Sequence, residues 1–429
     1  MLSLFIYIWP IYKGYIIQLM YFNCSFKKEH EKIVFFRNEN YGIFGGDDEF
    51  MGDYIRGVVV KLDLTPEQEV LFKKNYGCTR KVHNELLNKY KAKYGKDSTK
   101  IPTQKELNQF LMESKKELPY LRETESTSLQ QARDDLHKAF KNSFKSKKHN
   151  TPKFHSKKKT RSSFRQTVRE EKRPVKNNTI TFRKYGKVNF STSVENLDLL
   201  NHPDTKFNSI TAFTDGLKHY AAFNIQTNLP EQLPLTEKHI GCDINSNKNG
   251  WLVTSKKQKE YFDVNHDNQM IKKINRLMSK CRNRSRRWKK LQKRLQKWYN
   301  KRTNKLKDYI EKLTYNLVKK YDTIVFEENY NTIKILIGGE QNMIFPLSRF
   351  IQRLKDKFQL YKPEAEGVQF VKSHNTSRTC HHCGHINKEL EVKTRKYACP
   401  KCGKTLDRDI NAAINILNRW FNGDSLKNT

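Results

Sequence analysis

The order of apolar and polar positions predicts strands and helices in the first half of the chain. Residues 56–64 (RGVVVKLDL) are rich in β-branched side chains and predict a strand. The next four residues, Thr65–Gln68, form a capping box with proline at the first helical position, so a helix begins there. Apolar residues recur at helical spacing over about 127–144, and residues 165–235 read as short strands separated by turns. This half therefore predicts helices packed against a small sheet or β-barrel.

A new domain is predicted to begin near residue 238, where two apolar strands each carry an acid at their end. The segment 239–245 (HIGCDIN) contains Asp243, and 322–331 (DTIVFEENYN) contains Glu327 and Glu328. A single acid of this kind most often caps a turn or accepts hydrogen bonds from backbone amides. Two such acids at strand ends in one domain suggest that they belong to a shared site.

The remaining pattern completes an α/β domain. A helix is predicted around 346–361, a strand at 368–374, and a helix of small residues (NAAINIL) just after Asp409. Acids thus end strands or begin a helix at three widely separated places.

Composition adds a partner class to this picture. The chain has 429 residues, which is long enough for two or three domains, with a formal net charge of +38 and a pI near 9.8. Such an excess of Lys and Arg is typical of proteins that bind phosphate backbones. A ribosomal or chromatin-type binder fits the charge equally well, so the charge indicates a polyanion and nothing finer.

One segment concentrates that charge. Residues 272–307 hold seventeen Lys or Arg and no acid, while apolar residues recur at helical spacing. Solvated helix faces normally mix the two signs, so this segment predicts a helical pair that follows a nucleic-acid backbone. The candidate contacts are Arg284, Arg286, Arg287, Lys289, Lys290, Lys293, Arg294 and Lys297.

A second basic run, residues 145–165, has aromatic residues among its cations. Phe154 and Phe164, with Phe144 just before the run, would suit a single strand of RNA or DNA that stacks on rings and pairs with charges. A solvated loop explains the same pattern equally well.

Four cysteines have the spacing of a zinc ribbon. Cys380 and Cys383 form one CxxC pair, and Cys399 and Cys402 form the other after a gap of fifteen residues. Since four thiolates already complete a tetrahedron, the nearby His381, His382 and His385 are expected to be solvated neighbours. The other cysteines show no pairing logic, which favours a reducing compartment.

The acids suggest a second metal site with different chemistry. Two-metal cleavage of a phosphodiester needs two or three carboxylates around a pair of Mg²⁺ ions roughly 4 Å apart. Mg²⁺ keeps several waters, so three acids suffice. Asp407 is expected to sit at the helix N-terminus, where the dipole favours an acid, which leaves Asp409 as the metal ligand.

The motifs GCDIN, IVFEENYN and TSRTCHHCGH…YACPKCGKTLDRDINAAINIL together resemble the TnpB or OrfB proteins of insertion sequences. Those proteins are relatives of Fanzor proteins and of type V CRISPR effector nucleases. The segments KLDLTPEQEVLFKKNYGCTRKVHNELL and LQQARDDLHKAFKNSFK are also similar to the family's opening and helical lobe. The resemblance covers about residues 55–420.

The resemblance implies a multidomain α/β and α+β fold. It contains an RNase H-like (RuvC) nuclease domain with an inserted zinc ribbon, a β-barrel-like wedge and a helical lobe. The implied boundaries are 1–50 for an extension outside the fold (a second start at Met51 is conceivable), 51–236 for wedge and helical lobe (helices about 66–150), 237–378 for the first nuclease part, 379–404 for the ribbon and 405–429 for the last nuclease part.

The resemblance also assigns roles by position. Asp243 matches the first catalytic acid and Asp409 the third, while Glu327 is taken as the second with Glu328 as the alternative. Zn²⁺ would be structural and Mg²⁺ catalytic. Two departures stand out: Asn245 replaces the usual glycine two residues after the first aspartate, and the order EENYN differs from the common acid–acid–aliphatic order.

The implied activity is Mg²⁺-dependent cleavage of DNA guided by an RNA made from the transposon end. The implied partners are that guide RNA, target DNA and a companion transposase encoded separately, with no membrane. The alternative is a degenerate RNA- or DNA-binding regulator of the same family. We expect an intracellular protein, cytoplasmic or nuclear and not secreted, because no convincing targeting signal is present.

Overall fold

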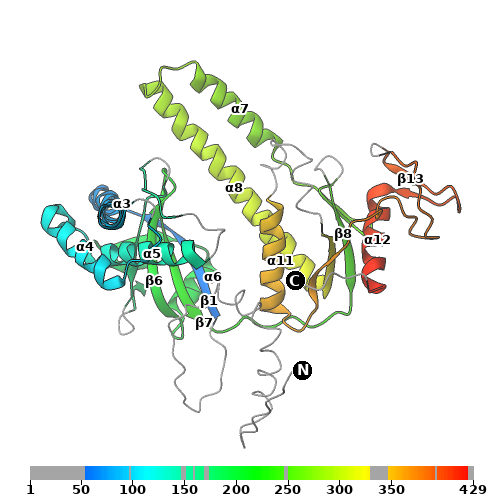
Figure 1. The fold of residues 1–429 in the computed structure, drawn as a ribbon, viewed down its shortest axis with the longest axis horizontal. Helices are drawn as coiled ribbons and strands as arrows, with labels where there is room; N and C mark the ends of the chain where they lie inside the picture. Colours follow the sequence, from blue (N-terminus) through cyan, green and yellow to red (C-terminus); the bar gives the residue numbers. More distant parts are fainter. Residues whose placement is uncertain are drawn as a thin grey trace, which may run out of the picture. The chain divides into compact units, whose positions relative to one another are not determined.

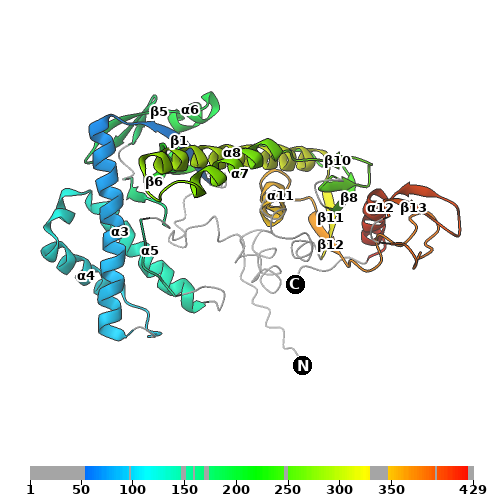
Figure 2. The ribbon, with the colours of Figure 1, turned by 90° about the horizontal axis from the view of Figure 1, so that it is seen from above.

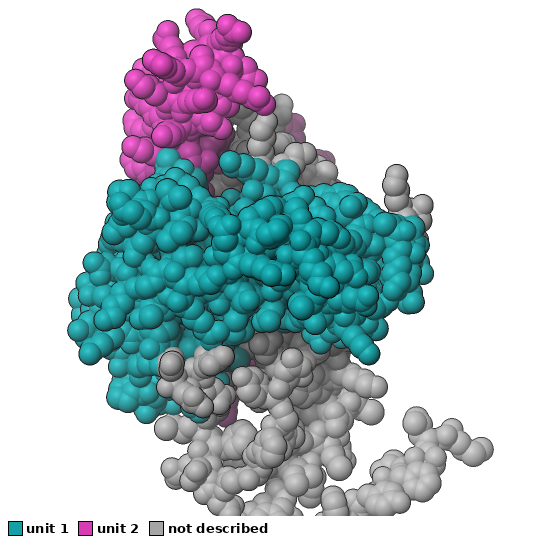
Figure 3. All heavy atoms as spheres, turned by 90° about the vertical axis from the view of Figure 1, so that its left-hand side faces the viewer, with its two compact units in different colours: residues 1–229 teal, residues 230–429 magenta. Residues whose placement is uncertain are grey.

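The computed structural model describes residues 54–95, 98–145, 151–157, 160–168, 173–245, 250–328, 346–391 and 394–423. The expected extension, residues 1–50, lies outside this part of the chain. Two compact units divide the chain at residues 229 and 230, and Figure 3 shows them in separate colours.

Unit 1 is built on an open, seven-stranded antiparallel sheet of half-barrel form. The strand order is β2-β6-β7-β1-β5-β4-β3. The predicted first strand is β1, and its central residues Val58 and Val60 are buried in the sheet's core together with Phe223. The strands are β1 (Tyr54–Asp63), β2 (Ser163–Thr167), β3 (Val175–Lys176), β4 (Thr179–Phe182), β5 (Gly186–Ser191), β6 (Lys206–Thr214) and β7 (His219–Thr227).

The two helices predicted in unit 1 begin where the sequence predicts, whereas α6 lies in the stretch 165–235 that was predicted as strands. The Thr65 hydroxyl accepts the Gln68 backbone N–H, and the Gln68 side chain accepts the Thr65 N–H, so the capping box is complete. The predicted second helix is α5. The helices are α3 (Pro66–Tyr94), α4 (Gln104–Glu117), the 3₁₀ helix η1 (Pro119–Glu123), α5 (Ser126–Lys145) and α6 (Val194–Asn201).

The basic run that precedes β2 corrects one expectation about its aromatic residues. Phe164 is 2% exposed and packs edge-on against Phe72 in the core, so its ring is closed to a nucleic-acid base. Phe154 is half exposed, with the ammonium of Lys91 over its ring at 4.6 Å. Of these two rings, Phe164 therefore belongs to the core and Phe154 lies at the surface. Their alternation with cations in the sequence could not tell the buried ring from the exposed one.

Unit 2 is built on a five-stranded mixed sheet in the order β10-β9-β8-β11-β12. Strands β8, β11 and β12 run parallel, and β9 and β10 extend the sheet antiparallel. The strands are β8 (His239–Ile244), β9 (Leu252–Thr254), β10 (Lys259–Glu260), β11 (Thr323–Glu327) and β12 (Gly367–Val371).

Helices cover both faces of this sheet. Phe326 of β11 faces α8 (Arg286–Lys320) and α11 (Leu347–Tyr361), whereas its neighbour Val325 faces α12 (Arg408–Phe421) and packs near Ile416. The contact with α12 is close, because a Cβ added to Gly241 would lie 2.2 Å from the backbone oxygen of Ala413. Glycine at this position lets the helix backbone rest directly on β8.

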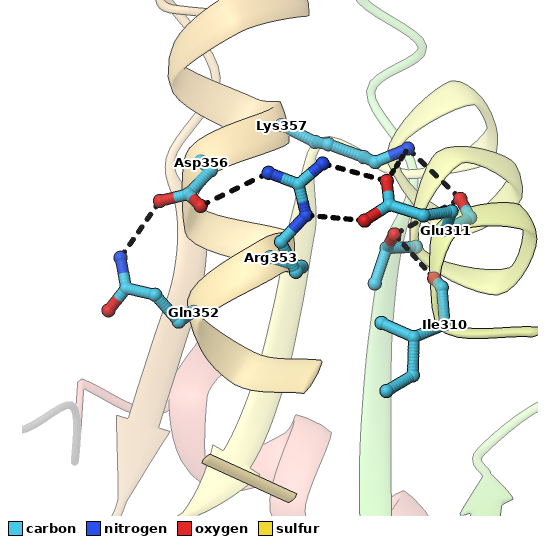
Figure 4. A network of polar contacts seen from close by, with 7 residues as sticks. Ile310, Glu311, Gln352, Arg353, Asp356 and Lys357 are labelled. Atoms are coloured by element: carbon cyan, nitrogen blue, oxygen red, sulfur yellow. Dashed lines mark hydrogen bonds and ion pairs between the residues drawn. The ribbon is translucent and has the colours of Figure 1, made fainter. Parts of the chain in front are cut away.

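The cationic segment forms two antiparallel helices, α7 (Asn265–Ser279) and α8, that extend away from the sheet of unit 2 (Figures 1 and 2). The pair is joined by an ion pair between the buried Asp267 and Lys305 at 2.7 Å. Farther along α8, the Glu311 carboxylate accepts two hydrogen bonds from Arg353 of α11, each 2.7 Å long. Lys357 of α11 donates to the Glu311 backbone carbonyl (Figure 4). These contacts fix the base of this helical pair on the sheet. We call the pair of α7 and α8 the cationic arm.

The ribbon lies between β12 and α12 in the sequence. It contains the two-stranded sheet of β13 (Lys396–Ala398) and β14 (Thr405–Asp407), whose last residue caps α12. None of the helices in the described part of the chain has the length and apolar character that a membrane crossing requires.

Candidate functional site

Two acids lie at the carboxyl ends of neighbouring parallel strands in unit 2. The register of β8 and β11 aligns the residues just before Asp243 and Glu327. Because side chains alternate along a strand, Asp243 points to the same face as Gly241, and Glu327 to the same face as Val325. Helix α12 covers that face. The fold therefore directs both carboxylates toward the helix that carries the third acid.

The third acid, Asp409, is in the first turn of α12 and is 5% exposed. Asp407 is the N-cap, and its carboxylate accepts the backbone N–H groups of Asp409 and Ile410 at 3.0 and 3.3 Å. Asp407 also pairs with Lys259 at 2.7 Å, and the pKa of its carboxyl is held below the usual range. Asp407 therefore lies at the helix N-terminus, as the sequence predicts.

The Asp243 carboxyl lies close enough to the other two acids to feel their charges. Burial, followed by the nearby charges of Glu327 and Asp409, raises the pKa of Asp243 to about 8. Burial likewise raises the pKa of Glu327 and the pKa of Asp409. The negative charges near the desolvated Asp243 carboxyl raise its pKa, and a bound cation would relieve this cost.

The three carboxylates converge without being tightly packed. In the described part of the chain, the four ribbon cysteines are the only group of three or more His, Cys, Asp or Glu ligand atoms that all lie within 4.8 Å of one another. The three acids do not form such a set.

Glu327 and Glu328 differ in position. The Glu327 carboxylate accepts a hydrogen bond from the Thr376 hydroxyl and faces Asp243. Glu328 is exposed, and its backbone N–H is bound to the Val371 carbonyl at 2.9 Å. The geometry thus favours Glu327 as the acid that belongs to the site.

Three polar neighbours complete the surroundings of the acids. The Asn245 amide donates to Asp243 Oδ2 at 2.8 Å, and Arg395 Nη1 lies 3.4 Å from both oxygens of Asp409. Thr376 binds Glu327, as described above. Asn245 was visible in the sequence as a departure from the family motif. Thr376 and Arg395 were not, because Thr376 reaches the site from the segment before the ribbon and Arg395 reaches it from within the ribbon.

The four cysteines form a ready metal site. Cys380 Sγ lies 3.7 Å from Cys402 Sγ, and Cys383 Sγ lies 3.5 Å from Cys399 Sγ. Zinc–sulfur bonds of about 2.3 Å require tetrahedron edges of about 3.8 Å, so the spacing fits Zn²⁺. A glycine with positive φ follows each pair, Gly384 at 72° and Gly403 at 70°. These glycines allow the tight turns that direct two thiols inward.

The cationic arm presents its side chains to solvent. Arg284 lies in the turn between α7 and α8 at a φ of 64°, and the other seven predicted contacts lie on the first half of α8. All eight are exposed, while Trp288, Leu291 and Leu295 are partly covered. The structure therefore brings these cations together on one helix, separate in the fold from the three acids.

Three family models match parts of the chain. They are a model described as a helix-turn-helix domain of OrfB proteins over residues 51–98, the OrfB model described as "Probable transposase" over 222–331, and a Cas12f1-like TNB domain over 348–416. Within residues 54–95 the first match corresponds to strand β1 and the long helix α3. The third match spans α11, the ribbon and most of α12.

Whole-length relatives have related descriptions. A Streptomyces pristinaespiralis protein described as "Putative RNA-guided DNA endonuclease" is 26% identical, with 82% of this chain and 86% of that protein covered. The Escherichia coli "Putative RNA-guided DNA endonuclease InsQ" is 25% identical, with 83% and 90% covered. The mimivirus "TnpB-like protein L79" is 34% identical over a shorter region, 39% of this chain and 31% of that protein.

A solved structure gives the same result for the fold. The Cas12f1 chain in a complex with sgRNA and target DNA aligns with a TM-score of 0.51 and 15% identity, covering 82% of this chain and 83% of that one. The multidomain α/β architecture is therefore Cas12f-like. Together the matches confirm the resemblance to the TnpB/OrfB family that the motifs predicted.

Proposed function

We propose that this TnpB/OrfB-family protein is an RNA-guided DNA endonuclease associated with DNA transposition. It would cut by Mg²⁺-dependent hydrolysis in an RNase H-like (RuvC-like) domain formed by the sheet of unit 2 and α12. The observation that supports this most is the convergence of Asp243, Glu327 and Asp409 on one face of that sheet, from two parallel strands and a helix. The descriptions of the whole-length relatives point the same way.

The donor set suits hard divalent cations. Three carboxylates offer oxygen ligands, and burial, which raises the pKa of all three, disfavours their charged forms unless cations bind them. Mg²⁺ ions held there would activate a water and stabilise the leaving oxygen of the cleaved bond. The chain's own contribution is position: β8 and β11 hold two acids side by side, and the cap of α12 fixes the third.

The four-cysteine cluster is proposed to bind structural Zn²⁺. Its closed set of four sulfurs leaves no open position for a substrate, which is the pattern of structural rather than catalytic zinc. The partly exposed histidines next to it are not needed as ligands.

The proposed partners are a guide RNA made from the end of the element and the DNA that it pairs with. In guided nucleases, base pairing reads the sequence and the protein holds the backbone. The exposed cations of α8, among them Lys289, Lys293 and Arg294, are suited to the second task. A companion transposase encoded separately would carry out strand transfer.

One observation favours a second candidate, a regulator of the same family that binds nucleic acid without cutting. Asn245 donates its amide to Asp243, so a carboxylate oxygen that a cation needs is already engaged. Loss of metal binding at this point would leave the arm and the ribbon intact.

Cleavage of a plasmid library with a randomised flank decides between the two. The protein would be co-expressed with the RNA that flanks its gene and assayed with Mg²⁺, beside an Asp243→Asn variant of equal size. Cutting that the variant lacks, with RNA binding unchanged, supports the nuclease. RNA that co-purifies with a wild-type protein unable to cut supports the regulator.

A further inference from the structure

The segment from Lys372 to Thr379 connects β12 to the ribbon, and Thr376 in its middle contacts one of the three acids. Thr376 is 4% exposed, and its hydroxyl donates a hydrogen bond to the Glu327 carboxylate. The hydroxyl also lowers the pKa of Glu327, opposing the effect of burial. A residue from outside the sheet thus holds one of the three acids.

Helix α12 fixes this segment through a row of polar side chains spaced one turn apart. Asn411 Nδ2 donates to the Thr379 carbonyl at 2.7 Å, and Asn415 Nδ2 donates to the carbonyls of Thr376 and Thr379 at 2.8 and 2.6 Å. Arg419, a further turn along, donates to the Lys372 carbonyl at 2.7 Å. Asn411 and Asn415 are buried, so water cannot supply hydrogen bonds to their amides, and the carbonyls of this segment supply them instead.

The same row reaches the metal site. Asn411 Oδ1 accepts the backbone N–H of His381 at 3.1 Å, one residue after the ligand Cys380. The Thr379 N–H and hydroxyl both donate to the Asn375 carbonyl, at 2.9 and 2.8 Å, and close the turn that carries Thr376. Cys380 is four residues from Thr376, and α12 binds both the Thr376 carbonyl and the residue that follows Cys380.

This arrangement matters because Glu has a long side chain with three rotatable bonds. In the described structure, the hydrogen bond that restrains the Glu327 carboxylate comes from Thr376. Residues that orient a metal ligand typically change metal affinity or activity by about 10- to 100-fold when they are lost. A ribbon of this size depends on its metal for folding, so the position of Thr376 depends on that metal too.

We propose that Thr376 is a positioning residue for Glu327, and that the metal-loaded ribbon, through Asn411 and Asn415, holds Thr376 in place. The ribbon then helps to position the side chains of the three-acid site. This inference rests on the proposed nuclease function for the role of Glu327.

The test compares Thr376→Val, which keeps the shape and removes the hydroxyl, with Thr376→Ser, which keeps the hydroxyl. The full-length, zinc-loaded proteins would be examined for zinc content, melting temperature, RNA binding, Mn²⁺ binding by calorimetry and DNA cleavage against Mg²⁺ concentration. We expect Thr376→Val to weaken Mn²⁺ binding and cleavage by about 10-fold or more while zinc content and RNA binding stay unchanged. Thr376→Ser should recover most of both.

Two results would overturn this role. Normal Mn²⁺ binding and cleavage in Thr376→Val would show that the hydroxyl does not position Glu327, and equal defects in the Val and Ser variants would show that the effect is steric. The Mn²⁺ measurement needs no cutting, so it decides the matter even if the wild-type protein proves unable to cleave. Absence of cleavage in the wild type counts against the proposed function alone.

A third variant tests the link to the ribbon. Asn411→Ala removes the contacts with His381 and Thr379 but leaves Asn415 bound to Thr376. We expect it to weaken Mn²⁺ binding with zinc content unchanged. Because Asn411→Ala and Thr376→Val would both act on the position of Glu327, the double variant should bind Mn²⁺ only slightly more weakly than Thr376→Val alone. Fully additive defects, or normal Mn²⁺ binding in Asn411→Ala, would contradict the coupling.

Discussion

The side-chain amide of Asn245 donates a hydrogen bond to Oδ2 of Asp243 at 2.8 Å. The bond lowers the pKa of this acid, but it also engages an oxygen that a divalent cation would use. We expect Asn245→Gly to lower the Mg²⁺ concentration that gives half-maximal cleavage, by about 10-fold or more, because a hydrogen bond to a charged group contributes about 1.5–3 kcal/mol. Cleavage rates across a Mg²⁺ titration measure this.

Asn245→Ala is the matched control for that experiment. It removes the amide but keeps a Cβ, so it separates the hydrogen bond from crowding. If both variants cut less well than the wild type, Asn245 assists the acids and the obstruction hypothesis is wrong.

The raised pKa values predict a pH-dependent stability for the protein without Mg²⁺. Burial, then the charges of Glu327 and Asp409, raises the pKa of Asp243 to about 8. The folded protein therefore keeps a proton that the unfolded chain loses near pH 4, and the free energy of unfolding falls as pH rises toward 8. Asp243→Asn should raise the melting temperature strongly at pH 8 and less at pH 5.5, where only part of this stability has been lost.

Thermal melts of zinc-loaded protein across that pH range measure this difference. Adding Mg²⁺ should stabilise the wild type more at pH 8 than at pH 5.5, and should stabilise Asp243→Asn less. Parallel curves for the two proteins would mean that Asp243 titrates normally.

The sequence predicted the positions of Asp243 and Glu327 in the fold, because local patterns determine them. Asp243 and Glu327 follow apolar runs, and such runs become buried strands whose ends meet at one sheet edge. The caps at Thr65 and Asp407 depend only on residues within one turn, which is why they were predictable as well.

Other features depended on contacts between distant segments. The role of Thr376 requires β11, the ribbon and α12 to be in place together, and nothing near Thr376 in the sequence indicates this. Phe164 was misjudged for a similar reason: its neighbours are cationic, but β2 pairs with β6 and turns the ring into the core. The close packing of Gly241 on Ala413 was equally invisible.

The ribbon should hold one Zn²⁺ per chain and lose it when a ligand is replaced. Cys402→Ser should weaken Zn²⁺ binding by about 100-fold or more, since structural zinc sites bind with about 10–16 kcal/mol shared among four ligands. Metal content by mass spectrometry and competition with a chelator measure this. Cys281→Ser is the control, because that thiol lies at the end of α7 and bonds only the Leu277 carbonyl among the contacts described.

Arg353 anchors α11 to α8 through its two hydrogen bonds with Glu311 (Figure 4). The pair is partly exposed, so we expect Arg353→Met to lower the free energy of unfolding by about 1 kcal/mol. Arg353→Lys should recover little, because an ammonium cannot make both bonds. Denaturant unfolding measures the change, and Arg349→Met, one turn earlier and exposed, should have almost no effect. A loss as large in Arg349→Met would assign the effect to helix propensity or solubility.

The arm should bind nucleic acid through its exposed cations. Replacing Lys289, Lys290 and Lys293 with Gln should weaken RNA binding and reduce the slope of log affinity against log salt by about 2 to 3, because each phosphate contact contributes about 0.7–0.9. The same three changes at Lys312, Lys319 and Lys320, near the other end of α8, remove equal charge where the helix is anchored on the sheet. Binding across a salt series measures both variants. If the attraction is only general, the two variants should lose the same RNA affinity. If the arm follows the nucleic-acid backbone, the first variant should lose far more. Equal slopes would therefore exclude the arm as a specific interface.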